Sequence, residues 1–452
     1  MSELFDPNDK KNKPILDYFE NKSWLVVEVS SSTRNSLKKT IAQLGSKMAN
    51  MYDADNFVDA QNLLNSKKPH FILGNKIING GSTISLFDSH LKAVPNRMNG
   101  GFFIITDENS LAEVALSLEY DMDGIISTPF TGFTILDTLI SGVKHKLAPT
   151  PYLKKIEEGR DRYINGHLDS ARESFQTALS LHKHPYEGHY FLGKIYSDNH
   201  LQDEAIHSYE ESIYHNSEFF KSLKNLSSLY YQKKEYIKAY DTNLLMANKY
   251  PTSPDRIPEL IRLSIINQKY EDIINYLKVF HTIESPGPEV QIYLSAGLAI
   301  LGKYFLNCND SEKGIEALKG SLKFSNGKHE ILKSITESFQ KYNQLNILFD
   351  LFEKIDVSNW SFESQGIYFH TLHSVSSDDQ RVVMTGEKLL KNKVREILVY
   401  KGLIERGIKM QRKIGYIENL VLEGTRNLPE YKDELESLLK KASQNLSTSN
   451  SV

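Results

Sequence analysis

The sequence predicts a multidomain protein in which a doubly wound α/β domain precedes an all-α superhelix of repeated helix pairs. Two observations carry this prediction. Between Trp24 and about Leu147, short apolar runs alternate with helix-length segments, which is typical of buried parallel strands joined by crossover helices. Farther along the chain, Ala171, Ala205 and Ala239 recur at equal intervals that match the length of one helix–turn–helix repeat, about 34 residues.

Composition excludes several classes of function. The 452 residues exceed the roughly 250 to 300 at which a single hydrophobic core stops growing, so at least two domains are expected. Lys and Arg number 54 against 57 Asp and Glu, without a long block of either sign, which argues against nucleic acid as a partner. The chain lacks a run of about 18 uncharged apolar residues, so we expect no membrane insertion.

Cysteine usage and the polar start of the chain favour a cytoplasmic protein. Cys308 is the only cysteine, so neither an intrachain disulfide nor a cysteine-based metal site can form. Residues 1–21 are polar, contain Pro7 and Pro14, and lack the apolar run of a signal peptide. We expect them to be a flexible N-terminal tail.

Residues 22–148 are predicted to form the α/β domain. The apolar pattern defines its expected elements, which are in chain order the strand WLVVEV, the helix NSLKKTIAQLG, the strands HFILG and GGFFIIT, the helix SLAEVALSLEY, the strand DGIIS and the helix ILDTLISGV. Pro149 and Pro151 then interrupt the chain, and the segment between the domains is the expected linker.

From Tyr152 onward the apolar period is helical almost to the end of the chain. Region 152–285 resembles tetratricopeptide repeats, whose two helices need small residues to pack closely, although Arg162, Asn243 and Met246 depart from the pattern. The small residues that match are Gly159, Ala171, Ala178, Gly193, Ala205 and Ala239. Residues 286–442 are predicted to be divergent repeats of the same superhelix. The polar residues 443–452 are expected to be disordered.

The α/β region resembles a bacterial response-regulator receiver over nearly all of its length. LVVEVSSSTRNSLKKTIAQLG corresponds to the first strand and helix of a receiver, KKPHFILGN to its third strand, FFIIT to its fourth, and DGIISTPF to its fifth strand and the next turn. The resemblance implies a flavodoxin-like order of parallel strands. It also makes the peptide bond before Pro129 a candidate cis bond.

The sequence differs from an active receiver where a receiver carries its chemistry. Asn75 replaces the phosphoacceptor aspartate, and an amide cannot form an acyl phosphate. Glu28 and Val29 replace the two acidic residues that hold magnesium, and Thr128 replaces the lysine that grips the phosphoryl group. Only Thr106 and the Pro129-Phe130 pair match. The resemblance therefore implies a pseudo-receiver with a degenerate phosphoacceptor pocket, formed by Glu28, Val29, Asn75, Thr106, Thr128 and Pro129.

Other interpretations of the α/β domain stay open. A different flavodoxin-like domain would bind a small ligand, such as a nucleotide or phosphate, at the carboxyl ends of its strands, and the segment NGGSTIS offers glycines and hydroxyls for a phosphate. A regulator phosphorylated at a non-standard residue such as Asp88 is a second alternative, and an enzyme of unrecognised type is a third.

The concave face of the superhelix is the surface expected to bind a partner. Its groove-facing positions carry positive heads among tyrosines, which suit an acidic or carboxylate-ended peptide. The resemblance to tetratricopeptide repeats implies which positions face the groove, and on that basis the candidate groove residues are Arg160, Tyr163, Tyr190, Lys194, Lys221, Lys224, Asn225 and Tyr231. Ile156 and Arg160 stand where the chaperone-binding repeats carry the Lys and Asn of a carboxylate clamp, so a chaperone co-factor is not expected. The alternative is that these lysines are simply solvated.

Motifs for catalysis and for cofactors are missing from the sequence. It contains no GxxxxGK[ST] loop, no GxGxxG after a strand, no HExxH and no GxSxG. Several histidines lie close together in sequence, namely His182, His184, His189, His200, His207 and His215. We interpret them as surface residues, since no i, i+4 pair shares a helix face with a third ligand. We therefore expect no enzyme activity, no cofactor and no metal.

Together these features predict a bacterial, cytoplasmic signalling scaffold. The pseudo-receiver would present a constitutive face for docking a partner or for forming a homodimer, and the superhelix would hold a second protein. Proteins that resemble this arrangement belong to phosphorelay (two-component), motility or cell-polarity circuits.

Overall fold

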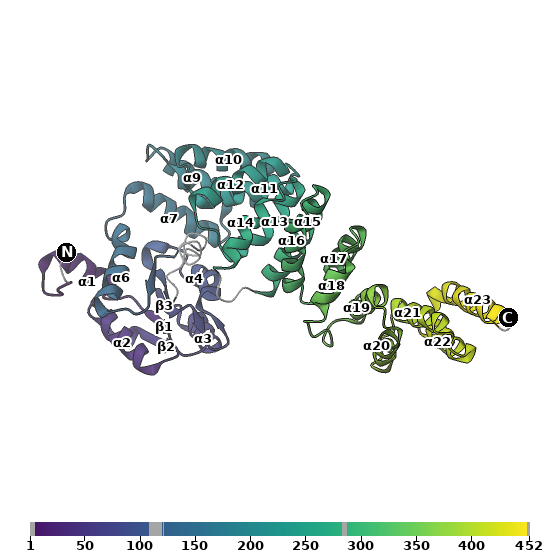
Figure 1. The fold of residues 1–452 in the computed structure, drawn as a ribbon. Helices are drawn as coiled ribbons and strands as arrows, with labels where there is room; N and C mark the ends of the chain where they lie inside the picture. The colour runs from purple at the N-terminus through teal and green to yellow at the C-terminus, as the bar shows by residue number, and fades with distance from the viewer. Residues whose placement is uncertain (1–4, 108–119, 121, 283–286, 450–452) are drawn as a thin grey trace. The chain divides into compact units, whose positions relative to one another are not determined.

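A computed structural model gives the structure of the chain and describes residues 5–107, 120, 122–282 and 287–449. The chain divides into two compact units, Met1–Ser253 and Pro254–Val452. The first unit contains the α/β domain and the first helix pairs, and the regular elements described in the second unit are all helices (Figure 1). None of the described helices is both long enough and apolar enough to cross a membrane.

A five-stranded parallel sheet forms the centre of the α/β domain. Its strands lie in the order β2–β1–β3–β6–β7, which is the flavodoxin-like order and confirms the predicted fold class. The strands are β1 (Trp24–Val27), β2 (Met51–Ala54), β3 (Phe71–Asn75), β6 (Gly101–Thr106) and β7 (Gly124–Ser127). The apolar pattern of the sequence predicts all of them except β2, which includes the exposed Asp53.

Helices cover both faces of the sheet because side chains alternate along each strand. Trp24 and Val26 face the cluster covered by α1 (Lys13–Phe19), α2 (Ser31–Ala42) and α6 (Gly132–Leu147). Leu25 and Val27 face the cluster covered by α3 (Phe57–Lys67) and α4 (Phe87–Ala93) (Figure 1). The helix expected over SLAEVALSLEY falls on residues 110–120, which lie outside the described residues except for Tyr120.

The segment NGGSTIS supplies the turn and the second strand of a small antiparallel hairpin, which consists of β4 (Ile77–Ile78) and β5 (Gly81–Ser82). Gly80 has a φ of 83°, so the glycine serves the turn. The Ser82 hydroxyl donates to the carbonyl of Lys76 at 2.8 Å, and the Thr83 hydroxyl donates to that of Asn75 at 2.6 Å. Two of the three hydroxyls in this segment, those of Ser82 and Thr83, therefore already donate to backbone carbonyls.

Parts of the two segments that we expected to be flexible or disordered, residues 1–21 and 443–452, are helical in the structure. Residues 10–19 form a short 3-10 turn and α1, and Phe19 is fully buried against Trp24 in the core, so this part of the expected tail 1–21 is folded. At the other end, α23 (Lys432–Ser449) continues through most of the expected tail 443–452. In the first case, one buried aromatic side chain anchors a segment whose composition is otherwise polar.

Three helix pairs complete the first unit, and their packing follows the predicted period. They are α7 (Pro151–Ile164) with α8 (Leu168–Leu179), α9 (Tyr186–Asp198) with α10 (Gln202–His215), and α11 (Phe220–Gln232) with α12 (Tyr236–Lys249). A Cβ on Gly159 would lie 2.6 Å from the Phe175 ring, and one on Gly193 would lie 2.7 Å from the Tyr209 ring. The second contact follows the first by one repeat length, so the two helices of both repeats pack through the same contact. The four predicted core alanines are buried, with Ala171, Ala178, Ala205 and Ala239 all at 0 % exposure.

In the third repeat, polar residues form the corresponding contact between the two helices. Ser227 and Asn243 occupy the positions of Gly193 and Tyr209, and the Asn243 amide donates to the Ser227 hydroxyl inside the repeat. The amide also donates to the Ala239 carbonyl at 3.2 Å. The departure of Asn243 from the repeat pattern is therefore matched by its partner, since a buried amide needs hydrogen-bond acceptors.

The turns between the paired helices repeat with the same period. Gly166, His200, Lys234 and Gln268 all have a positive φ, of 82°, 61°, 63° and 58°, and they recur once in every repeat length. In each turn the next residue's N–H donates to a carbonyl one turn back, as His167 does to Arg162. Gln268 lies between α13 (Ile257–Ile266) and α14 (Asp272–Phe280), so the period continues into a fourth repeat that the sequence pattern shows only weakly.

The second unit continues with tetratricopeptide-like helix pairs. Gly302 and Leu318 have the same separation along the chain as Gly159 and Phe175, and a Cβ on Gly302 would lie 2.7 Å from Leu318. After α13 and α14, its helices are α15 (Pro288–Asn307), α16 (Ser311–Phe324), α17 (His329–Lys341), α18 (Leu345–Phe352), α19 (Phe362–Val375), α20 (Asp379–Lys391), α21 (Ile397–Lys409), α22 (Ile414–Asn427) and α23. The expectation of divergent helical repeats after residue 285 agrees with this architecture.

The boundary between the compact units lies at Ser253, far beyond the expected linker. Only Ala148, Pro149 and Thr150 separate α6 from α7, and the Thr150 hydroxyl caps α7 by accepting from the Leu153 N–H at 3.2 Å. Pro149 and Pro151 therefore lie in a short connection between α6 and α7 within the first compact unit, and not at the boundary between the two units.

Candidate functional site

The residues predicted to form the degenerate phosphoacceptor pocket meet at one edge of the sheet. Glu28 follows β1, Asn75 ends β3, Thr106 ends β6 and Thr128 follows β7. These strands are neighbours and parallel, so their carboxyl ends share an edge. Sequence-distant residues are thus brought together here as the receiver resemblance implies.

Hydrogen bonds hold the side chains of this edge. The Asn75 amide donates to Glu28 Oε2 at 3.2 Å, and the Ser30 N–H donates to Glu28 Oε1 at 2.9 Å. Glu28 is only 7 % exposed, whereas Val29 is 45 % exposed and brings no charge. Asn75 acts here as a hydrogen-bond donor to a carboxylate, which is the opposite of the nucleophilic role that an aspartate would have.

Thr128 and its neighbours close the other side of the edge. The Thr128 hydroxyl donates to Asp107 Oδ1 at 2.6 Å. The Thr128–Pro129 peptide bond is cis, as the receiver resemblance suggested, and Thr106 is buried. Thr128 occupies the position of the receiver's lysine and carries no charge. It therefore cannot offer a positively charged donor to a phosphoryl group.

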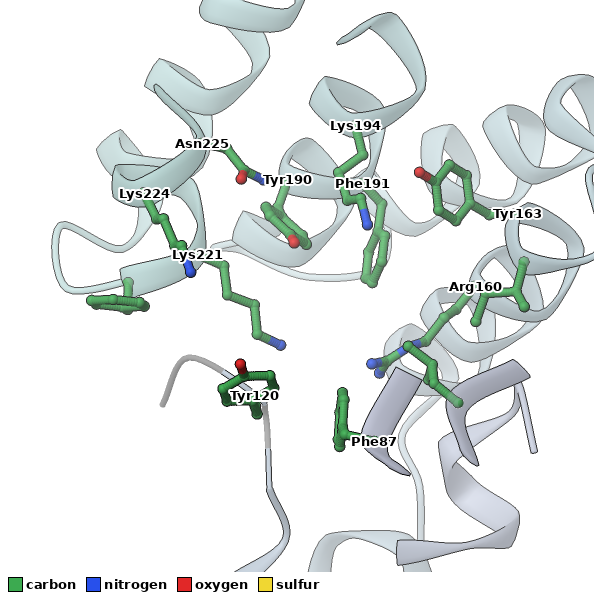
Figure 2. A pocket seen from close by; sticks show the side chains of 13 residues that line it. Phe87, Tyr120, Arg160, Tyr163, Tyr190, Phe191, Lys194, Lys221, Lys224 and Asn225 are labelled. Atoms are coloured by element: carbon green, nitrogen blue, oxygen red, sulfur yellow. The ribbon is translucent and has the colours of Figure 1, made fainter. Parts of the chain in front are cut away.

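A second feature is a cavity of about 210 Å³ within the first unit. Helices α7, α9 and α11 form most of its wall, and α4 with Tyr120 closes it from the side of the α/β domain (Figure 2). The lining residues are Phe87, Leu91, Tyr120, Arg160, Tyr163, Ile164, Tyr190, Phe191, Lys194, Phe220, Lys221, Lys224 and Asn225.

Four cations come together around this cavity. Figure 2 shows the heads of Arg160 and Lys221 pointing toward its centre from opposite walls, below the Tyr190 ring in this view. Lys194 lies with its Nζ 4.9 Å from the centre of the Tyr163 ring. Aromatic rings thus separate the positive heads and provide contact area among them.

A buried ion network positions Arg160. Glu157 Oε1 pairs with Arg160 at 3.3 Å, and Glu157 Oε2 accepts from the Arg97 backbone N–H at 2.7 Å. The Arg97 side chain in turn pairs with Asp123, which also binds Lys146. Because Arg97, Asp123 and Lys146 belong to the α/β domain and Glu157 to α7, the network fastens the domain to the first repeat.

The electrostatics of the cavity favour an anion. Burial lowers the pKa of the Lys194 ammonium; the negative charge of Asp198 opposes this effect, and the positive charges of Arg160 and Lys221 add to it. An entering carboxylate would stabilise the charged form of Lys194 by offsetting the repulsion among these cations. Tyr163 donates its hydroxyl to Asp198, which fixes the ring against Lys194.

Seven of the eight predicted groove residues line the cavity. Tyr231 does not, because its ring packs against Tyr236 with 5.4 Å between the ring centres. Ile156, which the repeat pattern also placed in the groove, is instead 1 % exposed and belongs to the packing of the helices. Phe87, Leu91 and Tyr120 were missed, since nothing local in the sequence indicates that the α/β domain closes the groove.

No protein-family profile and no curated protein matches the sequence. Similar solved structures include Naa15/Naa10 bound to HypK-THB, with 15 % identity, a TM-score of 0.39 and coverage of 69 % of this chain and 48 % of that one. The chain therefore spans about half the length of that protein.

Two further structures match a little more than half of this chain. A tetratricopeptide repeat protein from Parabacteroides merdae ATCC 43184 shares 20 % identity over 56 % of this chain and 97 % of its own, with a TM-score of 0.30. Pseudomonas aeruginosa pilF shares 14 % identity over 55 % and 95 %, with a TM-score of 0.20. No family membership follows from them. We base the repeat architecture on the periodic geometry of the helix pairs themselves.

Proposed function

We propose that this protein is a non-catalytic adaptor whose groove binds an acidic or carboxylate-ended segment of a partner protein. One observation carries the proposal. Arg160, Lys194, Lys221 and Lys224, which come from three successive repeats, surround a single cavity together with tyrosines. Positive heads supply charge-assisted hydrogen bonds, and tyrosines supply stiff contact area.

The size of the cavity supports a side chain or a chain terminus as the bound group. Its volume of about 210 Å³ is below the roughly 300 to 1,000 Å³ of typical small-molecule and cofactor sites. An aspartate or glutamate side chain, or a terminal carboxylate, fits this volume, while the rest of an extended peptide would lie along the groove.

For the α/β domain we propose a pseudo-receiver that is not phosphorylated at Asn75. Support comes from the shared strand order, from the position of Asn75 at the end of β3, and from its bond to Glu28. Such a domain would dock a partner or form a homodimer through a fixed face. We place the protein in the cytoplasm of a bacterium, in a two-component, motility or cell-polarity pathway, on the basis of the receiver resemblance and the single cysteine.

Binding of labelled peptides to the full chain tests the groove. The probes are glutamate-rich peptides with a free carboxyl terminus, the same peptides amidated, and lysine-rich peptides, measured by fluorescence anisotropy. We expect the free acidic peptide to bind best. Arg160→Ala or Lys221→Ala should each weaken it about ten- to a hundredfold, since a hydrogen bond to a charged group contributes about 1.5 to 3 kcal/mol.

The matched control is Lys154→Ala, an exposed lysine on α7 that does not line the cavity. It removes one positive charge from the same helix as Arg160 and should leave the affinity unchanged. Equal loss in Lys154→Ala, or equal binding of lysine-rich peptides, would contradict the groove as the binding site. A rise in melting temperature with nucleotide or phosphate alone, or labelling of Asp88 by beryllofluoride, would instead favour a ligand sensor or an unusual phosphoacceptor.

A further inference from the structure

Three potential metal ligands meet on the helix pair α9–α10, apart from the groove. They are His189, Glu211 and His215, and one ligand atom from each lies within 4.8 Å of the other two. Glu211 and His215 stand at positions i and i+4 on α10, so they share one face of that helix. His189, near the start of α9, reaches the same place because α9 and α10 pack together.

The geometry of the two rings leaves room for a shared ion. Their centres lie 5.3 Å apart with an interplanar angle of 19°, so the imidazoles are stacked side by side. In the described part of the chain, no hydrogen bond engages the ring nitrogens of His189 or His215 or the carboxylate of Glu211. All three side chains are half-buried, so solvent reaches them while the helices restrict their positions.

We propose that His189, Glu211 and His215 form a site for a divalent transition metal, with Zn²⁺ as the reference ion. Two imidazole nitrogens and one carboxylate oxygen are a set of three protein ligands that zinc accepts while keeping one position open. Imidazole ligands favour zinc, copper and nickel over magnesium and calcium. The half-exposed position leaves the fourth place to water.

A metal ion at this place would also connect the two helices of one repeat. Bound at this place, the ion joins the start of α9 to the end of α10, and α9 also carries the groove residues Tyr190 and Lys194.

The spacing of the histidines in the sequence does not indicate this cluster. The i, i+4 pair includes Glu211, and the third ligand comes from the other helix of the repeat. Only the packing of α9 against α10 reveals that the three belong together.

Zinc titration of the full chain tests the proposal. The protein must be free of any histidine tag, and it should carry Cys308→Ser, because Cys308 is an exposed thiol that binds zinc by itself. Isothermal titration calorimetry is expected to show one Zn²⁺ per chain. Loss of even an outer-shell partner weakens metal sites about 10- to 100-fold, so His189→Ala, His215→Ala and Glu211→Gln should each weaken binding at least about tenfold.

His167→Ala is the matched control, because it removes an exposed histidine at the start of α8, outside the three ligands. It should bind zinc like the parent protein. The absorption of bound Co²⁺ gives an independent readout, since the ligand-field bands report its coordination and should be lost in His215→Ala. Circular dichroism of each variant without metal verifies folding.

Two outcomes would overturn the proposal. One is the absence of stoichiometric zinc binding by the parent protein. The other is an affinity that stays the same in all three ligand variants, which would mean that the ion binds adventitiously at other surface residues.

Discussion

His90, on α4, is a buried imidazole whose environment favours the neutral form. Its side chain is 0 % exposed, and its Nε2 donates to the carbonyls of Pro69 and His70 at 3.2 and 3.0 Å. Nδ1 is buried without a partner among the described groups. Burial, with a smaller effect from the positive charge of Arg97, lowers the pKa of His90 to about 3, while the backbone carbonyls and Asp123 oppose the shift.

This environment predicts a pH-dependent stability. The folded-state pKa of about 3 lies below the ordinary 6.5, so the unfolded chain takes up the proton first. The stabilisation is therefore present above pH 6.5 and is lost as the pH falls, by about 1.4 kcal/mol of unfolding free energy per pH unit. Urea unfolding of the parent protein from pH 7 to about pH 5 measures this slope.

His90→Gln supplies the comparison, because an amide keeps a donor for the two carbonyls and does not titrate. Its stability should fall less steeply with decreasing pH than that of the parent protein. If both proteins have the same slope, His90 is not the group responsible.

At the scale of elements, the two helices of each repeat approach each other closely at equivalent positions. In the first two repeats an aromatic ring packs directly against a glycine, Phe175 against Gly159 and Tyr209 against Gly193. In the third repeat a hydrogen bond between Asn243 and Ser227 takes the place of this contact. The repeats therefore keep one helix spacing with different chemistry.

Gly193→Ala tests this packing. The added Cβ would lie 2.7 Å from the Tyr209 ring, which must move, and such overpacking costs about 1 to 3 kcal/mol of unfolding free energy. Urea unfolding of fragment 1–253 provides the measurement. Gly132→Ala is the control, because its Cβ would meet nothing nearer than the Thr40 hydroxyl at 3.8 Å. A similar effect in both variants would contradict a specific contact with Tyr209.

At the scale of the molecule, the α/β domain and the first three helix pairs belong to one compact unit. The Asp123 ion network and the Arg97 to Glu157 hydrogen bond connect the domain to α7. Removing α7 would leave the Arg97 N–H and the surface around Phe87 without these contacts. The repeats therefore act as a structural part of the domain as well as a binding surface.

Two fragments test this organisation. Fragment 1–253 should fold and unfold in a single urea transition, because it contains a complete unit. Fragment 1–148 should unfold at lower urea concentration, since it loses the contacts of α7 with Arg97. Hydrogen exchange of the Arg97–Asn99 turn gives the local readout. Equal midpoints and equal exchange would show that the domain does not depend on the repeats.

The sequence by itself determined the two fold types, the positions of four sheet strands and the helix pairs with their small residues. These features follow from local periodicity, because apolar runs and the repeat period are visible in neighbouring residues. Most residues that line the cavity were predicted from the resemblance to tetratricopeptide repeats. Only the tertiary structure decided that Phe19 anchors α1, that α4 closes the groove, that the compact unit ends at Ser253, and that His189 meets Glu211 and His215. Each of these depends on contacts between residues that are distant in sequence or on different helices, and such contacts arise from packing that no local pattern encodes.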